Sequence, residues 1–371
     1  MFNFIYFSFF ISFPYYFVSS GLPQVSHIFM LVGILYFVSI YYKNLMFEIC
    51  REPYAVYFLL YVILINTIYM IYFIDMVFFK YTLYYIFNIS IFYMTIVLLK
   101  MKKISLNVVV YSLLVGLLLL LFFGYLFIDI NFRERESLFF NNPNQLGYYG
   151  LLIATLYSII DFKGIKNKYY TFLYSLSIYI LSFILIFLSS SLTAIIGFFL
   201  LIIFNIIQYV MKNFQLKSFI SMILIVLLGA TVFINSNIEN NMLLKRVSKI
   251  NKKVENLVQD RGYDRIVNND EYILFGAGEG RFERFDSEHK GELHSTLGNI
   301  LFSYGFIGFI LFLLILYSNY MNWFKVTVFI SPLLVYSLTH NGIRNPLFWI
   351  FLAIIVVNFK RNKSQAILES N

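Results

Sequence analysis

Charge is scarce in this sequence. Only 13% of the 371 residues are charged, whereas 60% are hydrophobic and 21% are aromatic. A soluble domain of this length carries about a quarter charged residues, so the deficit excludes an ordinary soluble protein. Short segments of alternating polarity, which are typical of transmembrane barrels, are also absent. Apolar runs near the roughly 20 residues that cross a bilayer recur from end to end instead, and they predict an all-α polytopic membrane protein.

Cysteines and cofactor motifs are equally scarce. Cys50 is the one cysteine, so the chain cannot form an intrachain disulfide. The sequence has no metal-ligand cluster with recognisable spacing and no nucleotide-binding loop, and the segments between apolar runs on the side that we assign to the cytoplasm are too short for a nucleotide domain. We therefore expect no metal, no other cofactor and no use of ATP.

The apolar runs divide a single integral membrane domain, residues 1–371, into about twelve expected spans. The first run lacks a basic segment before it and a clear cleavage site, so we interpret it as a span. Ser19, Ser20 and Gly21 leave a cleaved signal peptide open as the alternative. The expected spans are approximately 2–19, 25–42, 54–74, 81–99, 104–128, 146–160, 169–188, 192–210, 218–235, 295–317, 326–338 and 347–359.

The net charge of +9 is concentrated in alternate connections between the runs. One set of connections and the C-terminal tail carry fourteen Lys and Arg residues, and the short connections of the other set carry four: Lys80, Arg133, Arg135 and Arg344. Basic residues favour the cytoplasmic side of a membrane, so this asymmetry predicts that both termini are cytoplasmic. It also places the excess charge against anionic lipid, which removes nucleic acid as an expected partner.

The longest polar segment, 236–294, is then a large extracytoplasmic loop. It holds ten basic and eleven acidic residues, so its net charge is close to zero. Within it, apolar residues recur at steps of three and four, which predicts an amphipathic helix over about 242–258. This helix either lies along the membrane interface or packs on the bundle as a plain surface helix.

His294 stands where this loop meets the next apolar run. Steps of four and three lead from it to Gly298, Gly305 and Gly308 on one helical face. Small residues on one face let a neighbouring helix approach closely, so we expect a buried helix with His294 at its outer end. Ser295 or Thr296 can cap that end, and a helix N-terminus favours an anionic group. The alternative is an interfacial histidine bonded to a loop carbonyl.

The later part of the same loop, 261–284, holds four arginines and a glycine-rich stretch. Arginine binds phosphate oxygens in a fork, so these arginines could hold a phosphate-bearing ligand, or the neighbouring acids could neutralise them as surface pairs. The glycine-rich stretch, 276–280, is expected to be a flexible turn whose amides could also cradle phosphate. The arginines are Arg261, Arg265, Arg281 and Arg284.

Three shorter polar segments lie on the same predicted side. Asn142 and Pro143 read as a helix cap and first turn, after a loop that includes Arg135. The hydroxyls of 189–193 are expected to satisfy backbone groups at a tight turn. Arg344, in the polar turn 340–346, is a secondary candidate for anion binding.

His294-Ser295, then nine residues, then Gly305-Phe306-Ile307-Gly308 resembles the motif of the O-antigen ligase and polymerase superfamily. The stretch Leu274 to Gly280 is similar to that family's glycine-rich stretch before its histidine. Asn142, Pro143 and Asn144, with Ser191 and Thr193, stand where related patterns occur earlier in the chain. The number of spans and one large outer loop before a late span are also similar, and they imply a bundle of the GT-C type.

The resemblance implies a glycosyltransferase of the bacterial inner (plasma) membrane that uses a polyprenyl-pyrophosphate-linked oligosaccharide and needs no cofactor. It implies that His294, or a nearby carboxylate such as Glu279, assists the acceptor hydroxyl. Arg261 is then the first candidate for the pyrophosphate, with Arg265 and Arg344 next. Implied partners are the lipid-linked oligosaccharide, membrane lipid and a chain-length regulator protein.

Three functions remain open at this point. Many ligases of the family have arginine after the serine of the earlier motif, whereas Leu192 follows Ser191 here. This favours a polymerase of repeat units, for O-antigen, capsule or exopolysaccharide, over a ligase that moves finished glycan to a lipid core or protein. A flippase or transporter of the lipid-linked unit is the alternative from another class, and it should show internal repeats or ionisable residues in mid-membrane.

Overall fold

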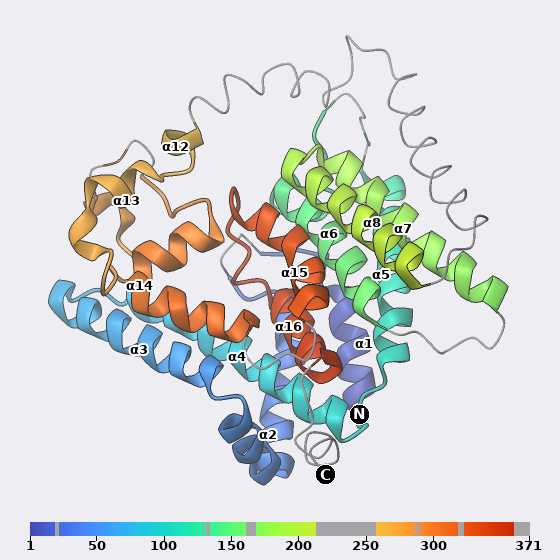
Figure 1. Ribbon diagram of the computed structural model, residues 1–371, viewed down its shortest axis with the longest axis horizontal. Helices are drawn as coiled ribbons and strands as arrows, with labels where there is room; N and C mark the ends of the chain where they lie inside the picture. Colours follow the sequence, from blue (N-terminus) through green and yellow to red (C-terminus); the bar gives the residue numbers. More distant parts are fainter. Residues whose placement is uncertain are drawn as a thin grey trace.

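The computed structural model is helical wherever it describes the chain (Figure 1). It describes residues 1–18, 22–128, 130, 134–160, 168–212, 257–285, 287, 290–317 and 323–359. Those residues contain no strand. The helices are α1 (Phe2–Ser12), α2 (Val25–Arg51), α3 (Tyr54–Phe73), α4 (Val77–Lys100), α5 (Leu106–Phe127), α6 (Pro143–Ile159), α7 (Lys168–Ser189), α8 (Leu192–Lys212), α12 (Leu257–Asp260), α13 (Asp264–Asn268), α14 (Thr296–Tyr317), α15 (Trp323–Ser337) and α16 (Pro346–Phe359).

Helices occupy eleven of the twelve predicted ranges, and the range 218–235 lies outside the described residues. Six of these helices, namely α2, α3, α4, α5, α7 and α14, are long and apolar enough to cross a membrane. Shorter apolar helices or helix segments lie in α1, α8, α15 and α16. The all-helical class and its polytopic membrane character therefore agree with the prediction. The predicted amphipathic helix at 242–258 lies outside the described residues, apart from the start of α12.

α16 forms the centre of the bundle (Figure 1). Every residue from Pro346 to Val356 is buried, because the segment is apolar on all sides and can be covered all round. α16 packs against α4 and α6, α3 packs against α4 and α14, and α15 packs against α8. α14 and α3 thus form one side of the molecule together with α12 and α13 (Figure 1).

Two predicted ranges show the largest differences from the observed helices. α1 ends at Ser12 rather than near residue 19, because Pro14 has no backbone amide with which to continue the helix. α2 continues to Arg51 instead of ending near residue 42, with a kink at Tyr41 (φ −114°, ψ 24°). Several polar residues after Tyr41 are good helix formers, so the helix extends beyond the end of the apolar run from which it was predicted.

The glycine face predicted for α14 is wrong in one respect. Gly305 does not admit a neighbouring helix; it interrupts α14 with φ 64° and ψ −173°. A Cβ there would lie 2.4 Å from the carbonyl oxygen of Leu274. The neighbour is therefore the backbone of the preceding loop. Figure 1 shows α14 changing direction part-way along.

The glycine-rich loop fills this interruption. The amides of Ala277 and Gly278 donate to the carbonyl oxygens of Phe302 (2.9 Å) and Ser303 (2.8 Å). In the other direction the amide of Phe306 donates to Ile273 (2.7 Å). Backbone groups that the break would leave unsatisfied are thus paired, which is the condition for irregular backbone inside a membrane protein.

Candidate functional site

The polar loops meet at one end of the bundle, where α6, α8, α14 and α16 begin; we call this the loop end. The turn between α15 and α16 is tied to the start of α14, since Thr296 donates from its amide and from its hydroxyl to the carbonyl oxygen of His340, each at 3.2 Å. Thr193, near the start of α8, lies 3.2 Å from the ring of His340. Residues far apart in the sequence therefore share one site.

Arg135 approaches this site from the loop before α6. Its Nε donates to the carbonyl oxygen of Ser189 (3.1 Å), and its guanidinium also donates to Oδ1 of Asn144 (2.6 Å). The hydroxyl of Tyr336 donates to the carbonyl oxygen of the same Asn144 (2.9 Å). These contacts hold Arg135 beside the ring of Tyr336 on α15.

Arg261 reaches the same place from the loop after α12. Its carbonyl oxygen accepts a hydrogen bond from the amide of His294 (3.2 Å), and its charge acts on both Tyr336 and Arg135. The structure thus brings the backbones of Arg261 and His294 together. The structure also places Arg135 at this site. The sequence had shown only that Arg135 lies in a loop on the same predicted side of the membrane.

The charge of Arg261 acts on Arg135, and both charges act on Tyr336; we refer to these two residues as the arginine pair. Burial lowers the pKa of both guanidinium groups; for Arg135 the charge of Arg261 lowers it further, while Tyr336 opposes the shift. Asp260 acts on Arg261 in the opposite direction. Among the described residues, neither arginine forms an ion pair. Partly desolvated like charges of this kind favour the binding of an anion.

The start of α14 is capped as predicted. The hydroxyl of Ser295 accepts from the amide of Gly298 (3.0 Å) and donates to the carbonyl oxygen of Ser337 (3.0 Å). The hydroxyl of Tyr263 lies 2.8 Å from that of Ser295, and its ring covers Gly298. This cap fixes where α14 begins and therefore fixes the backbone of His294.

Glu279 lies inside the protein with no exposed surface. Its carboxylate accepts hydrogen bonds from the hydroxyls of Tyr85 (3.0 Å) and Tyr304 (2.8 Å) and from the amide of Asn299 (3.0 Å). Its own backbone amide donates to the side chain of Asn66 (2.9 Å). Both carboxylate oxygens are thus engaged, so this side chain organises α3, α4 and α14 around it.

Arg344 lies between two carboxylates. Its guanidinium forms an ion pair with Glu292 and lies 3.8 Å from Glu279. The same group lies over the rings of Tyr81 (5.0 Å) and Tyr84 (5.7 Å) of α4. Its charge is already balanced within the protein, unlike that of the arginine pair.

Arg265 is fully buried, although the sequence suggested it as an anion ligand. Its guanidinium contacts the rings of Phe282, Phe285 and Phe302 at 5.4–5.9 Å and donates to the carbonyl oxygen of Gly291 (2.8 Å). It therefore holds the loop together as a cation among aromatic rings.

Arg284 has a similar environment. It contacts Tyr69, Phe73 and Phe78 and donates to the carbonyl oxygen of Ala277. Burial lowers its pKa to about 10.

The glycine-rich stretch has the positive φ angles that glycine permits, at Gly276, Gly278 and Gly280, but its amides do not form a phosphate cradle. The amides from Gly276 to Glu279 donate to Tyr272, Phe302, Ser303 and Asn66, all within the protein. These amides have no capacity left for phosphate oxygens. The sequence could not show this, because the acceptors come from other parts of the chain.

The earlier motifs have the local roles that their residue types predicted. Asn142 caps α6 by accepting from the amide of Gln145 (3.0 Å), and Pro143 occupies the first turn. The Ser189 hydroxyl donates to the carbonyl oxygen of Ile186 and accepts from the amide of Ser191. Asn144 has a further role, because it links Arg135 to Tyr336.

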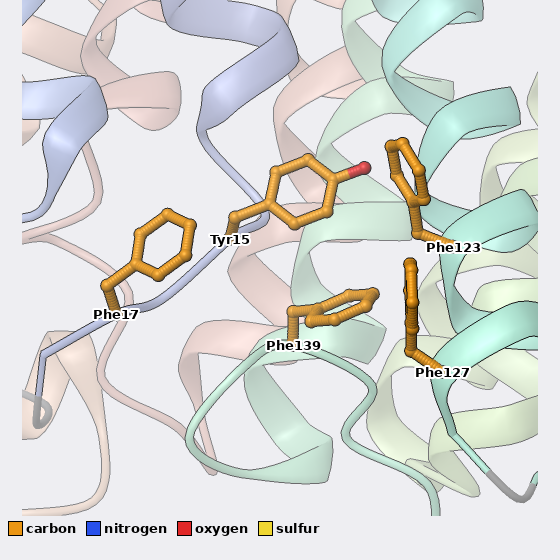
Figure 2. Close-up of a pocket in the computed structure, with 5 residues that line it drawn as sticks. All are labelled: Tyr15, Phe17, Phe123, Phe127 and Phe139. Carbon is orange, nitrogen blue, oxygen red and sulfur yellow. The ribbon is translucent and has the colours of Figure 1, made fainter.

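An aromatic cavity lies beside the loop that carries Arg135 (Figure 2). Phe139 of that loop lines it, and the carbonyl oxygen of Phe139 accepts from the amide of Tyr16 (3.1 Å). The full lining is Tyr15, Phe17, Phe123, Phe127 and Phe139. Such a surface suits an apolar group and offers no proton-transfer or metal-binding chemistry.

The described residues contain no cluster of His, Cys, Asp and Glu that could hold a metal ion. In comparisons with known proteins, no family model matches the chain, and no curated protein matches it either.

Proposed function

We propose that this protein is a membrane glycosyltransferase that takes its glycan from a polyprenyl-diphosphate donor. One observation carries the proposal: Arg135 and Arg261, from separate loops, share a partly buried site beside Tyr336 with no ion pair to either among the described residues. A diphosphate matches this pair, because guanidinium groups hold phosphate oxygens in a fork.

The arrangement supports glycosyl transfer in particular. When an acceptor hydroxyl attacks the anomeric carbon of the donor sugar, the bond to the diphosphate breaks and negative charge grows on the departing phosphate. Arg135 and Arg261 would stabilise that charge, which is the role of a preorganised electrostatic site. The aromatic cavity beside Phe139 offers apolar surface for the isoprenoid chain of the same donor.

The remaining predicted residues receive different roles in this proposal. His294, whose amide is bonded to Arg261, lies at the donor end of the site. Glu279 and Arg344 act together as a positioning network for α4 and α14. Arg265 supports the fold of the loop and is not a donor ligand.

We also propose the membrane arrangement that the charge pattern predicts. About twelve spans would hold the loop end on the extracytoplasmic side of a bacterial inner membrane, with both termini in the cytoplasm. The lipid-linked donor would then meet the arginine pair at the outer surface.

The donor proposal is tested with lipid-linked glycan extracted from a deletion strain, which should accumulate its own substrate. Purified wild-type protein in lipid nanodiscs should convert it to longer or transferred glycan. Arg135→Gln and Arg261→Gln should each reduce the rate by roughly 100-fold, about the effect of removing one group that stabilises developing charge. Arg281→Gln is the matched control, because Arg281 pairs with Asp75 and Glu283. Equal losses in all three variants would contradict the site.

The surface polysaccharide of the deletion strain separates the reaction types. Single repeat units on the acceptor indicate a polymerase, which we favour. Long lipid-linked chains with none attached indicate a ligase. A polysaccharide pattern unchanged from wild type would contradict both the polymerase and the ligase reaction. Accumulation of lipid-linked units on the cytoplasmic side would indicate a transporter.

A further inference from the structure

A second histidine, His340, lies at the loop end and stacks on Tyr336. The ring of His340 stacks on Tyr336 at 4.6 Å with an interplanar angle of 19°, and Tyr336 stacks in turn on Tyr148 at 4.4 Å. The hydroxyl of Tyr336 donates to Asn144, whose side chain accepts from Arg135. A short series of contacts therefore joins this imidazole to the proposed diphosphate site.

The partners of its ring suit a group that changes its protonation state. Nδ1 of His340 lies 2.9 Å from the hydroxyl of Thr339 and 3.2 Å from that of Thr193. A hydroxyl can donate to a neutral ring nitrogen or accept from a protonated one. A backbone carbonyl, the usual partner of a structural histidine, can only accept. The two threonines can thus orient the ring before and after it takes up a proton.

The backbone of His340 is fixed as well. Its carbonyl oxygen accepts from both the amide and the hydroxyl of Thr296. That hydroxyl accepts from the amide of Gly342 (2.8 Å). The stacked ring, its threonine partners and this anchor place the imidazole with little freedom, as proton transfer to a fixed substrate requires.

Two carboxylates near this end, Glu279 and Glu292, are less suitable as proton acceptors. Glu279 has no exposed surface and accepts three hydrogen bonds. Glu292 is paired with Arg344.

We propose that His340 is the general base of the transfer reaction, an assignment that rests on the proposed function. The acceptor hydroxyl oxygen forms a bond to the anomeric carbon as the bond from that carbon to the diphosphate oxygen breaks. The diphosphate departs with the bonding electron pair and is held by Arg135 and Arg261. The hydroxyl proton passes to the imidazole of His340 and is later lost to water. His294 remains on the donor side of the site.

The ring stacks on Tyr336 of α15. The charged and titratable groups that act on Tyr336 are Tyr148 of α6 and, from two loops, Arg135 and Arg261. A base must be neutral to accept a proton, so the rate should fall on the acid side of the pH profile. The tyrosines and arginines keep their charge states in that range, so variants of the two histidines are compared with wild type to assign the fall in rate.

The test measures glycan transfer against pH for the full-length protein in nanodiscs, with the lipid-linked glycan from the deletion strain. His340→Gln should lower the rate at saturating donor by roughly 100- to 10,000-fold. It should also remove the acid limb, that is, the fall in rate on the acid side of the pH profile. The affinity for inorganic pyrophosphate should stay within about twofold of wild type, since the arginine pair is unchanged. His294→Gln is the matched variant and should retain the acid limb.

A second variant guards against misfolding of the first. Thr193→Val with Thr339→Val keeps the imidazole and should displace the acid limb, because the ring loses its hydroxyl partners. If His340→Gln shows the same fall in rate at acid pH as wild type, the assignment is overturned. If His340→Gln does not fold, the same result in the double variant overturns it. If the wild-type protein transfers no glycan, both the proposed function and the assignment of His340 are overturned. If only His294→Gln loses the acid limb, His294 is the general base instead.

Discussion

A single buried carboxylate organises the polar interior between three helices. Glu279 accepts from Tyr85 on α4 and from Asn299 and Tyr304 on α14, and its backbone contacts Asn66 on α3. An isolated buried carboxylate is costly. Here three donors and a nearby arginine offset that cost, so the residue type cannot change without leaving donors unsatisfied.

Replacing Glu279 should therefore destabilise the protein. Glu279→Leu leaves three buried donors without their acceptor, at about 1–3 kcal/mol each, so we expect a loss of about 3–9 kcal/mol. Glu279→Gln keeps one acceptor oxygen and should lose less. Thermal unfolding in detergent, followed by size-exclusion fluorescence, measures both. Glu283→Gln is the control, because the Glu283 side chain is 67% exposed. If this control lost as much thermal stability as Glu279→Leu, the stabilising role of the Glu279 network would be contradicted.

At the scale of elements, the interruption of α14 is the least regular feature. The conformation of Gly305 is one that only glycine adopts readily, and the loop backbone occupies the space where a side chain would lie. The break therefore depends on two elements at once, the helix and the glycine-rich loop.

Gly305→Ala should destabilise the protein by about 2–6 kcal/mol, the sum of backbone strain at about 1–3 kcal/mol and overpacking at about 1–3 kcal/mol. The melting temperature in detergent should fall accordingly. Gly124→Ala is the matched control within α5, because its Cβ would meet side-chain methyl groups and no backbone; the nearest methyl belongs to Leu138, at 3.2 Å. A Gly305→Ala melting temperature equal to that of Gly124→Ala would contradict the fixed role of the break.

The elements differ in how far the sequence predicts them. Helix positions follow from apolar runs, and caps such as Asn142 and Ser295 from local residue types, so both were predictable. The break at Gly305 was not, because in sequence a glycine for close packing and a glycine for a helix break look the same. The burial of Arg265 and the arrival of Arg135 at the site also depend on contacts across more than twenty residues, which no local pattern records.

At the scale of the whole molecule, the one cysteine makes the membrane orientation measurable. Cys50 is exposed near the end of α2, on the side that the basic residues assign to the cytoplasm. A membrane-impermeant maleimide should label it in inverted vesicles and leave it unlabelled in intact cells. In a Cys50→Ser background, Lys290→Cys should show the opposite pattern, since Lys290 is exposed in the large loop. Labelling of Cys50 in intact cells would reverse the proposed orientation.

The interruption in α14 also bears on how the chain is made. The backbone groups around Gly305 have partners only when residues 273–278 lie against them, and that loop leaves the ribosome before the helix does. A membrane insertase would therefore release α14 stably into lipid only after the loop has docked. Biogenesis of this region then becomes an ordered event, and faults in the glycine-rich loop would be seen first as degradation of nascent protein by membrane quality control.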